Sequence, residues 1–159
     1  MILLVLFVII VTSVYVSSEH TFYWWDYSNY QNHTRDTARA FLESPNNILY
    51  KAVRTLYRTW KSTGNEFGNV TPTVLLFPFL LIFGDSRLVY IVSIALVYLL
   101  PFALVLGAIA TKLIPFHPRA VFWSTALLTL LIPTVWAPTL RGYPDTGGAL
   151  LIALAILVY

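Results

Sequence analysis

Residues 22–31 of the sequence, FYWWDYSNYQ, set a single carboxylate, Asp26, within a run of aromatic side chains. Aromatic surroundings lower the local dielectric, so we expect the pKa of the Asp26 carboxyl to be raised, which suits it to act as a general base. The rings of Trp25, Tyr27 and Tyr30 offer faces on which a sugar ring can stack. The alternative is an aromatic belt at a membrane interface, with Asp26 capping the start of a helix.

A second carboxylate, Asp145, lies in the segment 141–148, RGYPDTGG, between two apolar runs. Because it precedes an expected helix, Asp145 is placed to cap that helix, to hold a metal ion or to orient a partner. Arg141 is a permanent cation suited to binding a phosphate. A divalent cation held by Asp26 and Asp145 is the one cofactor that these residues suggest.

A basic helix is predicted between the two acidic segments, from Ile48 to Ser62. Apolar side chains recur at helical spacing on one face and basic side chains on the opposite face, which is typical of a helix lying in the membrane interface near lipid phosphates. The alternative is a solvated helix packed on its neighbours. The apolar face holds Leu49, Val53, Leu56 and Trp60, and the basic face holds Lys51, Arg54, Arg58 and Lys61. A shorter helix is expected from about Tyr30 to Glu43.

The composition predicts an integral membrane protein. Hydrophobic residues make up 58% of the chain and charged residues only 11%, against about 25% charged in a soluble domain. The absence of cysteine excludes disulfides and thiolate metal sites. A dispersed net charge of +3 argues against nucleic-acid binding and suits contact with lipid headgroups.

The apolar runs predict an all-α fold with about four transmembrane helices in a single module, 1–159. We expect an uncleaved first span, rather than a signal peptide, and a last span that is cut off, as in the N-terminal part of a longer protein. An external loop with interfacial helices follows the first span. The predicted spans are 1–17, 88–111, 120–138 and 148–159, and the external loop is 18–87.

Whether segment 74–84 crosses the membrane decides if the two carboxylates lie on the same side of it. It is only about half a bilayer long as a helix and contains Pro78, so we interpret it as an interfacial or re-entrant helix that does not cross. The short basic loop with Lys112, His117 and Arg119 is then cytoplasmic. Asp26 and Asp145 consequently face the same non-cytoplasmic compartment.

The segment Gly84-Asp85-Ser86-Arg87 predicts a turn before the second span. We expect Asp85 to cap the following helix or to pair with Arg87, rather than to take part in catalysis.

The order of these features resembles the N-terminal part of the GT-C type membrane glycosyltransferases, such as the protein O-mannosyltransferases and the aminoarabinose transferases. A span is followed by a loop acid, Asp26, and then by juxtamembrane segments that read TPTV at 71–74 and LIFGDSR at 81–87. A later span with an internal proline, Pro133, precedes the loop with Asp145. Many members have Asp-Glu in the first loop, whereas Tyr27 holds the second place here.

The resemblance implies a sugar transfer from a polyprenyl-phosphate carrier to a lipid, glycan or protein acceptor. Asp26 would be the catalytic base, and Asp145 would lie in the same external pocket. The family implies a multi-pass location, with a bacterial plasma membrane favoured over the endoplasmic reticulum. The alternatives are a transporter or channel component, which the uncharged spans disfavour, and a non-catalytic membrane scaffold.

Overall fold

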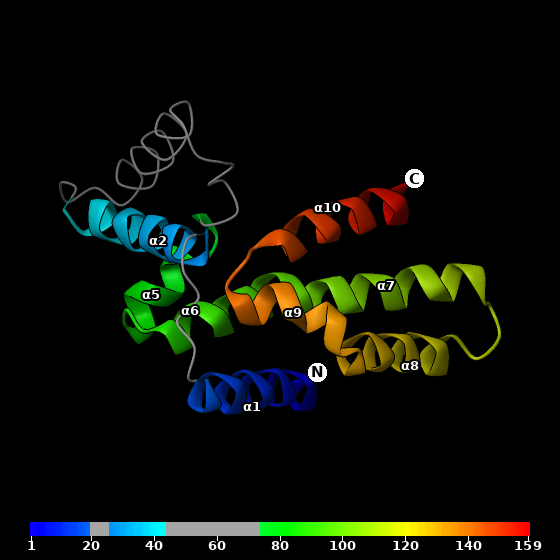
Figure 1. Ribbon diagram of the computed structural model, residues 1–159. Coiled ribbons are helices and arrows are strands. Elements are labelled where there is room, and N and C mark those ends of the chain that lie inside the picture. The colour runs from blue at the N-terminus through cyan, green and yellow to red at the C-terminus, as the bar shows by residue number, and fades with distance from the viewer. Residues whose placement is uncertain (20–25, 44–73) are drawn as a thin grey trace.

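The computed structural model describes residues 1–19, 26–43 and 74–159, without the side chains of 26–28. The elements in these ranges are all helical, so the predicted all-α class is confirmed for this part of the chain (Figure 1). The predicted basic helix at 48–62 lies outside the described residues. The helices are α1 (Ile2–Ser18), α2 (Asp26–Leu42), α5 (Phe77–Phe83), α6 (Arg87–Ile94), the π-helix η1 (Ala95–Leu99), α7 (Leu100–Leu113), α8 (Pro118–Leu131), α9 (Pro133–Arg141) and α10 (Asp145–Val158).

The longest helix runs without a break through α6, η1 and α7, from Arg87 to Leu113, close to the predicted span 88–111. Its 27 residues correspond to about 40 Å, enough to cross a hydrocarbon core of about 30 Å. Pro101 explains the π-helical stretch, because a proline has no N–H to donate and its ring clashes with the carbonyl four residues earlier in a regular helix. The wider turn is closed by the Leu100 N–H, which donates to the Ala95 carbonyl.

The predicted span 120–138 is present as two helices, α8 and α9, that meet at an angle of 58°. Pro133 causes the break, since it has no N–H and forces the preceding residue out of the helical region. Ile132 accordingly has an extended ψ of 113°. The Trp136 indole N–H donates to the Leu130 carbonyl over 2.7 Å, so this buried carbonyl near the break keeps a partner.

Length and composition support one membrane-spanning helix in the described residues, Arg87–Leu113, or two if α8 and α9 form a single bent span. The other two predicted spans are apolar helices of 17 and 14 residues, α1 and α10. At about 1.5 Å per residue they extend roughly 26 and 21 Å, less than a bilayer core. Four transmembrane helices are therefore not supported by these criteria.

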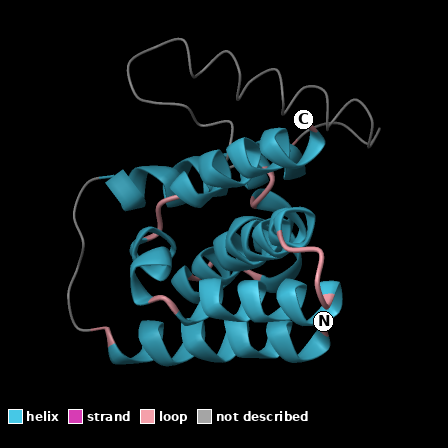
Figure 2. Cartoon of the chain, turned by 90° about the vertical axis from the view of Figure 1, so that its right-hand side faces the viewer, coloured by secondary structure: helices cyan, strands magenta, loops and turns pink. Residues whose placement is uncertain are grey.

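Four helical segments alternate in direction and lie side by side: α1, the long helix Arg87–Leu113, the bent pair α8–α9, and α10 (Figures 1 and 2). At one end, which we call the Arg87 end, Arg87 at the start of α6 pairs with Glu19 just after α1. At the opposite end, the Lys112 end, the Lys112 ammonium donates to the Leu157 carbonyl near the end of α10 over 2.5 Å. These contacts fix the direction of α1 and α10 against the long helix.

Two clusters of buried hydrophobic side chains hold these helical segments together. The first packs α1 against the long helix and the α8–α9 bend, with Val8, Leu99 and Ala103 fully buried. The second lies at the Arg87 end, where Leu76, Tyr90 and Ile91 hold α2 and α5 against α6.

The segment 74–84 contains the short helix α5. This helix has seven residues, about 10 Å, so it is too short to cross a bilayer. It ends at Gly84, whose φ of +90° suits a residue without a side chain. Leu80 is buried, whereas Ile82 and Phe83 are exposed.

Candidate functional site

Asp26 is the first residue of α2, which begins four positions before the predicted start at Tyr30 and ends close to the predicted Glu43. The predicted aromatic partner Trp25 lies outside the described residues, and the side chains of Asp26 and Tyr27 are not described. The aromatic setting of the Asp26 carboxyl and its raised pKa therefore remain predictions.

Tyr30 connects α2 to the junction between α9 and α10. Its ring meets the Tyr143 ring edge-on, with 6.4 Å between centroids and 75° between planes. Tyr30 follows Asp26 by one helical turn, and Tyr143 precedes Asp145 by two positions. The structure therefore brings the backbone positions of the two predicted acids to the same end of the helix bundle.

The α9–α10 junction is held in a defined shape. Gly142 adopts a φ of +87°. Its N–H donates to the Thr139 carbonyl, and the Tyr143 N–H donates to the Pro138 carbonyl, both in the last turn of α9. This is the usual glycine-dependent end of a helix. The Gly142 carbonyl accepts a hydrogen bond of 3.0 Å from the Tyr90 hydroxyl, so the junction is fastened to the start of the long helix.

Asp145 is exposed in the first turn of α10, and Pro144 takes the capping position without a side-chain hydrogen bond. The hydrogen-bonded cap that was one interpretation of Asp145 is thus not formed, because the helix begins at Asp145 itself. Its negative charge still stabilises α10, because it lies at the positive end of the helix dipole. Arg141 is also exposed, and within the described residues the two form no ion pair with each other. Both side chains are accessible from the Arg87 end.

The residues of the turn at 84–87 have other partners than those predicted. Ser86, not Asp85, caps α6 by accepting from the Val89 N–H over 3.2 Å. Asp85 pairs with Arg35 of α2, and Arg87 pairs with Glu19. Sequence proximity favoured Asp85 and Arg87 as partners, but the adjacent elements supply an opposite charge to each.

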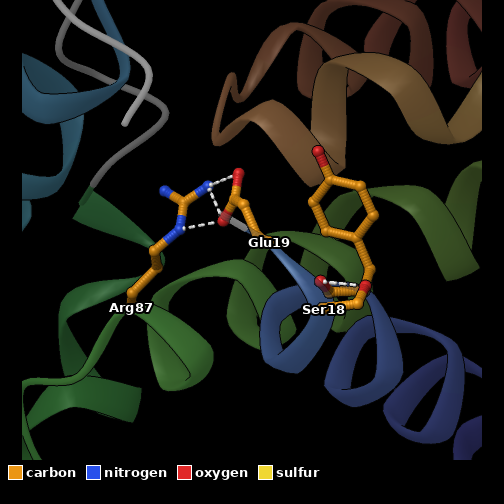
Figure 3. Close-up of polar contacts among 4 residues, drawn as sticks. Ser18, Glu19 and Arg87 are labelled. Atoms are coloured by element: carbon orange, nitrogen blue, oxygen red, sulfur yellow. Dashed lines mark hydrogen bonds and ion pairs between the residues drawn. The ribbon is translucent and has the colours of Figure 1, made fainter. Parts of the chain in front are cut away.

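The pair of Glu19 and Arg87 is bidentate (Figure 3). The Arg87 Nε and Nη2 atoms donate to the two carboxylate oxygens of Glu19, each over 2.7 Å. The Glu19 side chain is only 8% exposed and that of Arg87 is 23% exposed. Such a forked contact is strong and restricts direction as well as distance. Glu19 was not predicted as a site residue, although a lone acid at the end of a charge-free helix was a signal for it.

An open pocket of about 150 Å³ lies between α2 and α5. Two guanidinium groups, from Arg35 and Arg39, and the Asp85 carboxylate share it with leucine side chains. Sequence reasoning did not single out Arg35 or Arg39, and it considered Asp85 only as a turn residue. The lining comprises Arg35, Ala38, Arg39, Leu42, Leu80, Leu81 and Asp85.

The remaining predicted site residues are not tested by the structure. The candidate lipid-phosphate ligands Lys51, Arg54, Arg58 and Lys61 lie outside the described residues. Among the described side chains, no group of three histidine or acidic residues is arranged to hold a metal ion. A metal shared by Asp26 and Asp145 remains a prediction.

The described part of the chain is thus an all-helical bundle with one helix that is long and apolar enough to be a candidate membrane span, and with both candidate acids, Asp26 and Asp145, at one end. Comparisons with protein-family models, curated proteins and solved structures gave no match to this chain.

Proposed function

We propose that this chain is the N-terminal, multi-pass part of a membrane glycosyltransferase that uses a polyprenyl-phosphate sugar donor. The observation that carries the proposal is the common location of the α2 start, with Asp26, and the α9–α10 junction, with Asp145. The Tyr30–Tyr143 contact links these two segments. The order of span, loop acid, proline-broken span and second loop acid, which resembles the GT-C enzymes, supports the same function.

In this proposal Asp26 is the catalytic base. Its carboxylate takes the proton from an acceptor hydroxyl or amine, and the freed lone pair forms the new bond to the anomeric carbon of the sugar. The bond between that carbon and the phosphate oxygen breaks, and the electron pair leaves with the polyprenyl phosphate. Arg141 is suited to stabilise the negative charge on this leaving group, and Asp145 to bind acceptor, donor or a divalent cation.

The membrane arrangement belongs to the same proposal. The four alternating passes cross the bilayer together, with the short α1 and α10 accommodated by local thinning. The Lys112 end, with His117 and Arg119, lies on the cytoplasmic side. The Arg87 end, with both candidate acids, lies on the opposite side, where the resemblance to the GT-C enzymes places the sugar transfer.

The test is a transfer assay on Asp26→Asn in membranes containing the full-length protein, with a labelled sugar on polyprenyl phosphate. We expect transfer to fall by roughly 10²–10⁴-fold, because the amide cannot accept the acceptor's proton. The matched control is Asp36→Asn, the same change at an exposed carboxylate on the same helix, which should leave transfer unchanged. Transfer that survives in Asp26→Asn removes Asp26 as the base. A parent protein that transfers no sugar favours a scaffold or a transporter component.

A further inference from the structure

The turn at 85–87 holds both flanks of the segment that carries Asp26. Glu19, seven positions before Asp26, is bound by Arg87, and Arg35, nine positions after Asp26, is bound by Asp85. Glu19 and Arg35 come from separate parts of the chain, but their partners Arg87 and Asp85 are only two residues apart. One short turn therefore fixes the entry and the middle of the Asp26-bearing segment.

The turn is itself firmly attached to the long helix. Ser86 caps α6, and its carbonyl accepts the Tyr90 N–H over 3.0 Å, so the residue between the two charged partners starts the helix. The Tyr90 hydroxyl then reaches the Gly142 carbonyl, three positions before Asp145. A continuous set of polar contacts thus runs from both flanks of Asp26, through 85–90, to the segment before Asp145.

The position of Arg87 in α6 is electrostatically unfavourable. Arg87 is the first residue of α6, where a cation opposes the positive end of the helix dipole. The Glu19 carboxylate, of which little is exposed, compensates this charge, and an ion pair removed from water often adds little net stability. What the forked pair adds is a defined direction and distance between α1 and α6.

We propose that the contacts of Asp85 with Arg35 and of Arg87 with Glu19, which we call the 85–87 anchor, position Asp26 relative to Asp145. The four residues are positioning residues, since none of them has to touch the substrate. This inference rests on the proposed function for its consequence on catalysis, but the positioning itself is a property of the protein without substrate.

The positioning is tested by measuring a distance between spin labels on cysteines placed at Asn29 and Gly148. The chain has no cysteine of its own, Asn29 is exposed on α2, and a side chain at Gly148 meets nothing within 4 Å. In the otherwise unchanged protein we expect one narrow distance distribution from double electron–electron resonance. Glu19→Gln and Asp85→Asn each remove one charge from the anchor and should broaden or shift it.

Asp36→Asn is the matched control, because it changes an exposed carboxylate on α2 that has no ion pair within the described residues. It should leave the distribution narrow. Arg87→Glu, which sets two carboxylates together, should broaden the distribution, and the exchanged pair Glu19→Arg with Arg87→Glu should narrow it again. If Glu19→Gln does not accumulate in the membrane, Arg87→Lys takes its place, since it keeps the charge but loses the fork.

Distributions in Glu19→Gln and Asp85→Asn that match the Asp36→Asn control would overturn the anchor, as would an exchanged pair no narrower than Arg87→Glu. In the transfer assay, the anchor predicts that kcat per folded protein falls roughly tenfold or more in Glu19→Gln, with the KM for the donor nearly unchanged. A parent protein without transfer activity, together with distances that respond as expected, rejects the proposed function and retains the anchor.

Discussion

Tyr90 joins two segments that are 52 positions apart in the chain. Its hydroxyl is the donor to the buried Gly142 carbonyl, and its ring is fully buried among α2, α5 and α6. Replacing a buried donor leaves the acceptor without a partner, which costs more than the hydrogen bond itself contributes.

We therefore expect Tyr90→Phe to lower the free energy of unfolding by about 1–2 kcal/mol. Thermal or denaturant unfolding in detergent measures the change. A Tyr90→Phe protein as stable as the parent protein would show that the hydroxyl contact does not stabilise the α9–α10 junction.

At the residue scale, chemical type was predictable from the sequence and pairing was not. Asp85 and Arg87 were recognised as charged turn residues, but their partners Arg35 and Glu19 lie 50 and 68 positions away. Only the packing of α2 and α1 against the turn brings these charges together. For the same reason the Tyr30–Tyr143 contact could not be predicted, although both rings stand near a predicted acid.

Helices α7 and α8 approach each other closely at Gly107. A Cβ atom built on Gly107 would lie 2.8 Å from the Phe122 backbone carbonyl oxygen, a separation that real Cβ atoms do not adopt. Small residues allow such close approach between apolar helices, as they do in membrane bundles.

Gly107→Ala should accordingly destabilise the protein by about 1–3 kcal/mol, since α8 must move away from α7. The control is Gly148→Ala on α10, where a Cβ meets nothing and alanine favours the helix. Unfolding measured for both variants in the same detergent should separate them. A Gly107→Ala protein as stable as Gly148→Ala would contradict the close contact.

At the element scale, the short helix within the segment 74–84 was predicted, whereas the bend at Pro133 was not, because 120–138 was interpreted as one span. Proline position alone does not predict a break, since Pro101 and Pro138 both lie within helices. Apolar composition alone does not establish a membrane span, because α1 and α10 are strongly apolar but have only 17 and 14 residues.

At the scale of the whole molecule, the charged side chains of the described residues divide between the two ends of the bundle. The stretches 2–18, 88–111, 120–140 and 146–158 contain none. The Lys112 end carries Lys112 and Arg119, whereas the Arg87 end carries both ion pairs, Arg141 and Asp145. The alternating direction of the helical segments brings the positions of Asp26 and Asp145 to the same end of the bundle. The side of a membrane on which this end lies stays a prediction.

The most direct test of this account is the side on which single cysteines react in intact cells. Asn29→Cys and Asp145→Cys, both exposed at the Arg87 end, should be labelled by an impermeant thiol reagent from outside. Ala120→Cys, exposed near the Lys112 end, should react only after the cells are opened. Labelling of Asn29→Cys and Asp145→Cys from opposite sides would contradict the shared site, and with it the proposed function.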